Sequence, residues 1–294
     1  MSRSNRQPHV VLVGFPNCGK STLFNVLTGS QSKVGNWSGV TVDIKHGTLP
    51  LEDGSAVLFD VPGITALTHL SDEQSLDSHA VHAFLPEDSP DLIINVIDAT
   101  HLQAQLYLTM QLREMGVPMV IAVNMMDQLD KSGEQLAISA LSECLACPVI
   151  PLVSTKRKGF TALKKSMSAA LGQLQTASPI VYPPLVEQAI EALMLGGGCH
   201  RWQAIQCLCG DYCVLNHLSD NQKQLLARWQ SACGAQLGQE SDLLIIDTLY
   251  TWINEQMKQI MQGSPKQDSW TEWLDAIILH RFWGIPLFIL IMYG

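Results

Sequence analysis

Short apolar runs alternate with amphipathic segments over most of the first 175 residues. The runs predict β-strands at residues 9–13, 42–51, 56–60, 92–98, 118–124 and 148–153. The stretch 52–54 suits a turn between two antiparallel strands, whereas the later, almost wholly apolar runs suit strands buried in a parallel sheet. Helical patterns lie between the strands, the first at residues 21–28 and the last at 160–175. This order predicts an α/β fold with a mostly parallel sheet.

The pattern becomes purely helical after residue 177. Residues 178–184 are predicted to form an extended linker, because each of their prolines disfavours helix in the residue before it. Helical patterns then cover residues 185–195, 201–208, 221–233 and 243–261, with a break at the glycines 196–198. Trp202, Trp229 and Trp252 are interpreted as packing anchors. We therefore divide the chain into an α/β domain at residues 1–177 and a small all-helical domain at 178–268.

The last residues form a dense apolar run. A membrane helix needs about 20 apolar residues, so the run at 283–293 is too short to cross a bilayer. His280 and Arg281 precede it, as at a membrane interface. We interpret residues 269–294 as a juxtamembrane segment and the start of a first transmembrane helix; a buried C-terminal helix or strand is the alternative. No secretory signal is visible before the first strand, so we expect the rest of the chain in the cytosol.

A glycine-rich loop joins the first predicted strand to the first predicted helix. It consists of Gly14, Phe15, Pro16, Asn17, Cys18, Gly19, Lys20 and Ser21. The glycines allow successive backbone N–H groups to face phosphates, Lys20 supplies a positive charge, and the Ser21 hydroxyl can ligate Mg²⁺ at a helix N-terminus. The pattern predicts a loop that binds the phosphates of a nucleoside triphosphate. A simple glycine-rich turn is the alternative.

Two later segments indicate the base. They comprise Asn124, Met125, Met126 and Asp127 after the fifth strand, and Ser154, Thr155 and Lys156 after the last. Asp127 can accept hydrogen bonds from both N–H donors of guanine, whereas adenine would present an acceptor to the carboxylate at a cost of about 1 to 3 kcal/mol. Backbone N–H groups of the second segment would meet the guanine oxygen, and Lys156 would lie over the ring. An ordinary solvated loop is the alternative for that segment.

Two further segments predict a nucleotide-dependent switch. They comprise Asp60, Val61, Pro62 and Gly63 after the third strand, and Gly39, Val40 and Thr41 within the glycine-interrupted stretch 34–42. Asp60 would accept from a Mg²⁺-bound water, Gly63 would approach the γ-phosphate, and Thr41 would close over Mg²⁺ when a triphosphate is bound. An ordinary β-branched strand residue is the alternative for Thr41. The five motifs in chain order indicate a GTPase, which converts GTP to GDP and phosphate.

The group that orients the attacking water is less evident. Ile64 follows the third motif and cannot hydrogen-bond a water, and no arginine lies between residues 6 and 113 to supply charge from the switch segments. A bound monovalent cation could supply that charge, with ligands from Asn17 and from the backbone near Gly35 and Trp37. The alternative for Asn17 is a loop asparagine that bonds to its own backbone.

Composition narrows the choice of partners. The 294 residues are 47% hydrophobic, enough for a large core, and carry a formal net charge of −9. An acidic chain gains little from counterion release, which argues against a nucleic-acid partner. The eight cysteines lack paired zinc-type spacing and are interpreted as reduced residues of a cytosolic protein. A metal site formed by Cys199, His200, Cys207 and Cys209 is the alternative.

The motifs together resemble the cytosolic region of the bacterial ferrous-iron transport protein B family, FeoB. The resemblance rests on the sequences GFPNCGKS at 14–21, VGNWSGVTV at 34–42, DVPG at 60–63 and NMMD at 124–127. It implies a small-GTPase-like P-loop G domain with potassium-stimulated GTP hydrolysis, in which Asn17 would ligate K⁺ and Gly35 and Trp37 would contribute carbonyl oxygens. A helical domain would connect this G domain to the membrane region.

We therefore expect the GTP-binding and GTP-hydrolysing module of a ferrous-iron transporter at the cytoplasmic face of the bacterial inner membrane. Lys20, Mg²⁺ and an Asn17-bound K⁺ would stabilise the transferring phosphoryl group, and Thr41 and Gly63 complete the catalytic set. Expected partners are guanine nucleotide, the membrane domain of the same transporter, small accessory proteins of the iron-uptake system and a second copy of the chain. The alternatives are a ribosome- or tRNA-directed GTPase and a non-catalytic nucleotide-sensing module.

Overall fold

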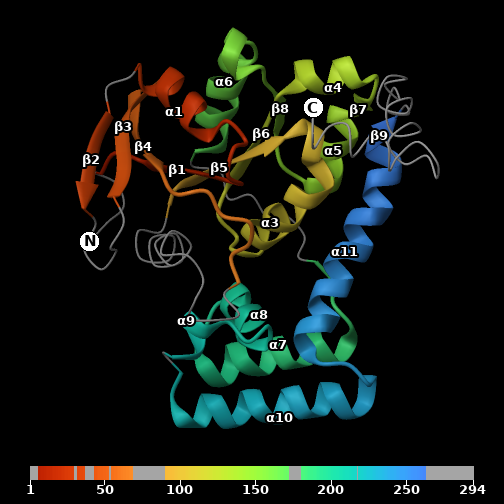
Figure 1. The fold of residues 1–294 in the computed structure, drawn as a ribbon. Coiled ribbons are helices and arrows are strands. Elements are labelled where there is room, and N and C mark those ends of the chain that lie inside the picture. The colour runs from red at the N-terminus through yellow and green to blue at the C-terminus, as the bar shows by residue number, and fades with distance from the viewer. Residues whose placement is uncertain are drawn as a thin grey trace, which may run out of the picture.

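A mixed sheet of seven strands organises the first half of the molecule (Figure 1). The computed structural model describes residues 6–29, 32–36, 43–52, 54–68, 90–171, 180–216 and 218–262. The strands of the sheet are β1 (His9–Gly14), β2 (Ser32–Asn36), β3 (Asp43–Leu51), β4 (Gly54–Asp60), β5 (Leu92–Asp98), β6 (Met119–Asn124) and β8 (Val149–Pro151). Their order is β2-β3-β4-β1-β5-β6-β8. The β2-β3 and β3-β4 pairs are antiparallel and the other pairs are parallel.

Helices cover both faces of this sheet. They are α1 (Lys20–Thr28), α3 (Leu102–Glu114), α4 (Met126–Ser132), α5 (Ile138–Leu145) and α6 (Phe160–Ala170), with short 3-10 turns η2 (Ala99–His101) and η3 (Ser154–Lys156). Alternate residues of each strand point to opposite faces. Val10 and Leu12 of β1 therefore pack with α1 and α6, whereas Val11 and Val13 pack with α3 and α5. Because both faces are covered, β5 is buried along its whole length.

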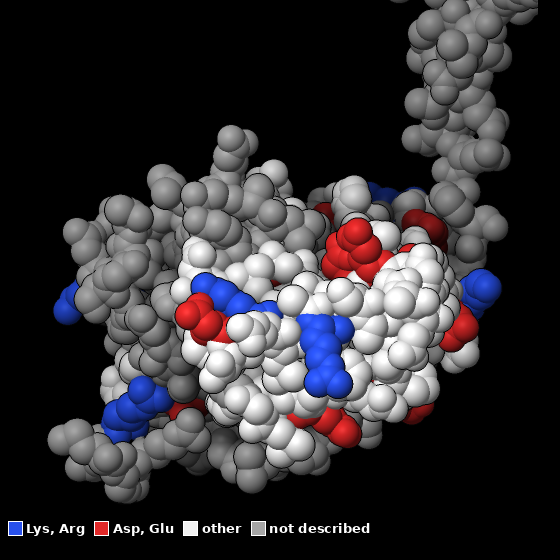
Figure 2. Space-filling view, turned by 90° about the horizontal axis from the view of Figure 1, so that it is seen from below, with Lys and Arg blue, Asp and Glu red and all other residues white. Residues whose placement is uncertain are grey.

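A separate group of helices lies below the sheet in Figure 1. It consists of α7 (Pro184–Gly197), α8 (Arg201–Leu208), α9 (Tyr212–Leu215) and α10 (Asp220–Leu237), and α11 (Ser241–Ile260) rises from these helices toward the level of the sheet. Seen from below, most of the described surface is uncharged, with scattered residues of both signs (Figure 2). The sequence of α10 accounts for part of this, because Arg228 is its only charged residue after Lys223.

Helix α11 leads the chain back from the helical part to the sheet. It contacts α3 and α5, and Tyr250 of α11 stacks on Tyr107 of α3 with ring centroids 5.3 Å apart. At its end, β9 (Met261–Gln262) pairs with β7 (Gln135–Leu136) in an antiparallel two-stranded sheet. A further backbone hydrogen bond joins Ala137 N to Ile260 O at 2.9 Å. The helical part is thus attached to the α/β part at both of its ends.

An ion-pair network marks the first of these attachments. Arg201 of α8 donates to both carboxylate oxygens of Glu187 on α7, at 2.8 and 2.9 Å, and to Glu114 at the end of α3, at 3.0 Å. It also donates to the carbonyl oxygen of Ile180, whose N–H donates to Glu114. Burial raises the pKa of Glu114 above its usual value, against the opposing charge of Arg201. The network ties α3 to the segment that enters the helical part.

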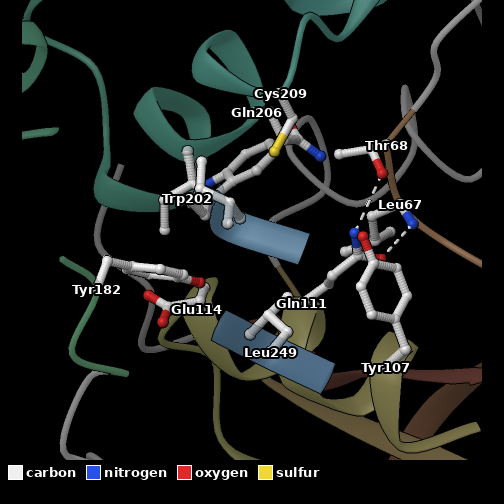
Figure 3. Close-up of a pocket in the computed structure, with 12 residues that line it drawn as sticks. Leu67, Thr68, Tyr107, Gln111, Glu114, Tyr182, Trp202, Gln206, Cys209 and Leu249 are labelled. Carbon is white, nitrogen blue, oxygen red and sulfur yellow. Dashed lines mark hydrogen bonds between the residues drawn. The ribbon is translucent and has the colours of Figure 1, made fainter. Parts of the chain in front are cut away.

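A small cavity of about 20 Å³ lies beside this network, with room for about one water molecule (Figure 3). Residues from the β4–β5 connection, α3, α8 and α11 line it. Gln111 of α3 accepts from Leu67 N at 2.7 Å and donates to Thr68 Oγ1 at 3.1 Å, as the dashed lines show. The segment that follows Gly63 is therefore held between α3 and the helical part.

Several predicted boundaries were wrong by a few residues. The last helix of the α/β part ends at Ala170, because Leu171 takes an extended conformation. The predicted strand 148–153 is shortened to Val149–Pro151. Helix α7 continues through two of the three glycines predicted to break it, and ends where Gly198 takes a positive φ of 63°.

Some predictions fall outside the described residues. They concern the switch residues 37–42 and the membrane segment at 269–294. Among the described helices, none combines the length and the apolar character that crossing a membrane requires.

Candidate nucleotide-binding site

The glycine-rich loop lies where β1 ends and α1 begins. Gly14 ends β1 in the middle of the sheet, and a Cβ atom there would lie 2.4 Å from Val96 O on the neighbouring strand β5. Asn17 and Gly19 have positive φ angles of 65° and 92°. The loop therefore turns sharply and presents the N-terminus of α1 at the carboxyl edge of the sheet, an arrangement that suits an anion.

The first and third motifs meet at Asp60, the last residue of β4. Its Oδ1 lies 2.5 Å from Lys20 Nζ, and its Oδ2 accepts from Ser21 Oγ at 3.3 Å. Both side chains of the ion pair are nearly buried, with exposed fractions of 10% for Lys20 and 5% for Asp60. Two hard oxygen donors, a carboxylate and a hydroxyl, therefore lie together beside the lysine, and such ligands are typical of Mg²⁺.

The start of the segment after β4 packs directly on the glycine-rich loop. Ile64 N donates to Gly14 O at 3.1 Å, and a Cβ atom on Gly63 would lie 2.8 Å from Pro16 N. Ile64 itself is 2% exposed and belongs to the core. Its side chain is apolar and buried, so it cannot orient the attacking water, as the sequence predicted.

Asn124 joins the glycine-rich loop to the two segments predicted to hold the base, 124–127 and 154–156, which we call the base-side loops. Its Nδ2 donates to Cys18 O at 3.0 Å, and its Oδ1 accepts from Ser154 N at 3.0 Å. The residue is 3% exposed, so the bridge lies inside the protein. The motif had indicated Asn124 only as a contact for a nucleotide, and this bridge was not predicted. A buried asparagine at the end of an apolar strand was the available signal, because a buried amide requires partners.

The two base-side loops also meet at an ion pair. Asp127 lies in the first turn of α4, and its Oδ2 is 3.1 Å from Lys156 Nζ in η3. Met125, before α4, has a positive φ of 61°. The hydrogen bond from Lys156 holds the pKa of Asp127 below its usual value. The carboxylate is therefore ionised at neutral pH, as an acceptor for a base edge must be.

The other predicted site residues lie partly inside and partly outside the described ranges. Gly35 lies in the edge strand β2, paired with Ile44 of β3. Trp37, Gly39, Val40 and Thr41 are outside the described residues. Four other predicted residues adjoin, in sequence, residues whose contacts are given above: Val61, Pro62, Met126 and Thr155. Phe15 packs against the buried hydrophobic residues on both faces of the sheet.

The cysteines do not form a metal centre within the part of the chain that the structure describes. Cys207 and Cys209 are buried, and Cys199 donates to Leu193 O at 3.4 Å. Burial raises the pKa of the Cys18 thiol in the glycine-rich loop to about 11. These thiols are packed and protonated, as residues of a core are.

Replacing Gly19 with alanine should destabilise the folded chain. Its φ of 92° disfavours a side chain, and the added Cβ atom would lie 2.2 Å from Asn124 Nδ2. Gly238→Ala is the matched control, because Gly238 has a φ of 71° and open space around it. We expect a loss of about 1 to 2 kcal/mol for the control and a further 1 to 3 kcal/mol for Gly19→Ala, measured by urea denaturation. Equal losses would mean that Asn124 moves away freely.

The mostly parallel sheet, the glycine-rich loop before α1 and the two linked base-side loops define a P-loop G domain, followed by a helical domain. The chain belongs to the ferrous iron transport protein B family, FeoB. The family model of that description matches residues 8–167, and a second model, the FeoB cytosolic helical domain, matches residues 182–262. The family and the fold predicted from the motifs are thereby confirmed.

Similar proteins agree with this assignment. The Fe(2+) transporter FeoB of Escherichia coli K12 is 37% identical over 293 residues, which cover 96% of this chain and 37% of that protein. The cytosolic domain of L. pneumophila FeoB matches with a TM-score of 0.76 and 32% identity, over 87% of this chain and all of that one. The mGMPPNP-bound NFeoB of S. thermophilus matches with a TM-score of 0.74 and 29% identity, over 88% of this chain and all of that one. The chain thus spans little more than a third of its full-length relatives.

Proposed function

We propose that this chain is the GTP-binding and GTP-hydrolysing module of a bacterial ferrous-iron transporter, and that its nucleotide state is coupled to iron uptake through the membrane domain. The observation that carries the proposal is the pair of hydrogen bonds made by Asn124, which join the glycine-rich loop and the base-side loops into one site. The GDP- and mGMPPNP-bound relatives support a guanine nucleotide in this site. The name of the full-length relatives supports Fe²⁺ as the transported ion.

In this proposal each motif has a chemical task. The loop from Gly14 to Ser21 holds the phosphates. Lys20 gives up its ion pair with Asp60 and pairs with the phosphates instead. Ser21, Asp60 and Thr41 fit Mg²⁺, which when bound neutralises charge on the phosphates. Gly63 and the residues around it approach the γ-phosphate, while Asn124 to Asp127 and Ser154 to Lys156 hold guanine.

Potassium is the second ion in the proposal. Asn17 lies on an exposed turn of the phosphate loop, where a neutral amide oxygen fits a monovalent cation. Carbonyl oxygens of Gly35 and Trp37 would complete the ligand set. When bound, the ion supplies the positive charge that no nearby arginine provides.

Replacement of Asn17 with alanine is expected to abolish potassium stimulation while GTP affinity stays within about threefold of wild type. We expect the wild-type chain to hydrolyse GTP about tenfold or more faster in KCl than in NaCl, and the variant to turn over equally slowly in both. Asn25→Ala, an exposed asparagine on α1, is the control and should retain the stimulation. An undiminished potassium effect in Asn17→Ala would remove this residue from the mechanism.

The direct test of the proposal is hydrolysis of GTP and ATP by the whole chain with Mg²⁺, in matched potassium and sodium buffers. Turnover of GTP but not ATP, faster in potassium, is the expected result. Equal use of both nucleotides would contradict the guanine assignment of Asp127. Failure to bind either nucleotide would contradict the proposed function as a whole.

A nucleotide-sensing module that turns over GTP only slowly is the second candidate. The buried side chain of Ile64 favours it, because the position after Gly63 offers no group to orient a water. Such a module would bind GTP selectively but gain nothing from potassium. The same measurement therefore separates the two candidates.

We further propose the division into a G domain at 1–177, a helical domain at 178–268 and a juxtamembrane segment at 269–294. The helical domain would transmit the change of nucleotide state from Leu67 and Thr68, which contact Gln111, toward the membrane domain. In this proposal the chain lies at the cytoplasmic face of the inner membrane. The membrane domain, small accessory proteins and a second copy of the chain are the proposed partners, and nucleic acid is not among them.

A further inference from the structure

The ion pair between Asp127 and Lys156 joins residues from two separate loops. In the small-GTPase motif Asn-Lys-x-Asp the basic residue lies two positions before the carboxylate, but Met125 occupies that place here. Lys156 comes instead from η3, 29 positions further along the chain, and reaches Asp127 Oδ2 at 3.1 Å. An apolar side chain and a charged one thus stand on separate loops beside the same carboxylate.

The geometry allows Lys156 and a base to use the carboxylate at the same time. Each oxygen of an ionised carboxylate can accept two hydrogen bonds. Lys156 occupies one acceptor position on Oδ2, and the backbone N–H of Asp127 itself also donates to the carboxylate. Two of the four positions then remain for the N1–H and N2–H donors of guanine. The Asp127 side chain is 26% exposed and that of Lys156 is 60% exposed, so both can be reached from solvent.

We propose that Lys156 is a specificity-determining residue of this site, which holds the Asp127 carboxylate in the orientation that accepts both guanine donors. The proposal rests on the proposed guanine-nucleotide function and adds to it the group that aims the carboxylate. Met125 then supplies only apolar cover for the base plane, and the charge is supplied by Lys156. The lowered pKa of Asp127 agrees with this role, since its largest cause is the hydrogen bond from Lys156.

The backbone around Lys156 supports a fixed position. Lys156 N donates to Val153 O at 3.0 Å, and Arg157 follows with a positive φ of 52°. Ser154, at the start of the same turn, is anchored to Asn124. The turn that carries the lysine is therefore fastened to the strand end from which α4 and Asp127 begin.

A role in orienting Asp127 differs from two simpler roles of a lysine. A lysine that only attracts phosphates would assist GDP and ADP equally, because both carry the same diphosphate. A lysine whose stem only covers the base could be replaced by methionine without loss. Orientation of Asp127 predicts instead a loss confined to guanine, and confined to chains that still contain Asp127.

The test measures dissociation constants of the whole chain for GDP, IDP and ADP with Mg²⁺, by competition with a fluorescent guanine nucleotide. Lys156→Met should weaken GDP about three- to tenfold, as loss of a partly exposed charged pair would, and leave ADP within about twofold. IDP, which lacks the N2 amino group, should lose less than GDP. Lys156→Arg should restore most of the GDP affinity, because it keeps the charge.

Two controls make the result specific. Lys158→Met changes an exposed lysine of the same loop and should leave all three constants unchanged. In an Asp127→Ala background, adding Lys156→Met should not alter the ratio of GDP to ADP affinity further. Equal losses for GDP and ADP, or no loss for GDP, would overturn the role of Lys156 while leaving the proposed function intact. A wild-type chain without preference for GDP over ADP would overturn both.

Discussion

Lys20→Met should lower GTP turnover by about 100- to 1,000-fold, the usual loss when a charged donor to a developing negative charge is removed. Lys20 is nearly buried at the N-terminus of α1, and its ammonium is the only charged group shown to contact Asp60 among the described residues. In the proposed site the lysine would exchange its carboxylate partner for the phosphates of the nucleotide. Methionine keeps the length and apolar stem of the side chain but offers neither the charge nor the donors.

The measurement is the turnover rate at saturating GTP, together with the dissociation constant for GDP. Lys165→Met, on the exposed side of α6, is the control and should behave like wild type. The variant also leaves Asp60 without its cation, so thermal unfolding should be followed to confirm that the chain is folded. A folded variant with turnover within tenfold of wild type would remove Lys20 from the chemistry.

Arg201→Met is expected to lower the free energy of unfolding by about 2 to 4 kcal/mol, because it leaves a buried carboxylate without its partner. Glu114 is only 6% exposed on its side chain, and Arg201 is 22% exposed. The guanidinium also bonds both oxygens of Glu187 and the carbonyl of Ile180. Methionine fills much of the same volume, so the loss reports the missing charge and hydrogen bonds.

The effect should depend on pH in a defined direction. Burial raises the pKa of Glu114, and removal of Arg201 takes away the charge that opposes this rise. A carboxyl group with a raised folded-state pKa binds its proton more tightly in the folded chain, so stability falls as pH rises from the ordinary glutamate value toward the raised one. The difference between Arg201→Met and wild type should therefore be smaller at pH 5 than at pH 7.5.

Urea denaturation followed by tryptophan fluorescence at the two pH values measures this difference. Arg228→Met, an exposed arginine on α10, should cost less than about 0.5 kcal/mol at both. A pH-independent loss in Arg201→Met would mean that Glu114 reaches water once its partner is removed.

The three central strands β1, β5 and β6 could be predicted within a residue because their signal is local. Residues 92–98 form an apolar run and became β5 with the same bounds. The edge strand β2 was not predicted, because the run Ser32–Asn36 is polar and glycine-containing. Its pairing with β3 makes it a strand, and pairing between separate segments has no signature in a hydrophobic pattern.

The site shows the same division. The phosphate loop and the role of Asp127 could be predicted from residue types and spacing, since their chemistry depends on a few neighbouring residues. Contacts across long separations were not predicted. Asn124 meets Cys18 across 106 positions, and Arg201 meets Glu114 across 87. Each requires the fold to be known first, because many polar residues could have served as partners.

The pairing of β9 with β7 sets where α11 must end and in which direction the chain must leave the helix. The helix begins at Ser241, whose hydroxyl donates to Leu208 O at 2.7 Å, and ends 20 residues later where β9 pairs with β7. At about 1.5 Å per residue it spans about 30 Å, and one inserted residue would turn everything beyond it by about 100°. Such an insertion would rotate Met261 and Gln262 out of register with Gln135 and Leu136. We therefore expect helix α11 to tolerate substitutions on its exposed face but neither insertions nor deletions.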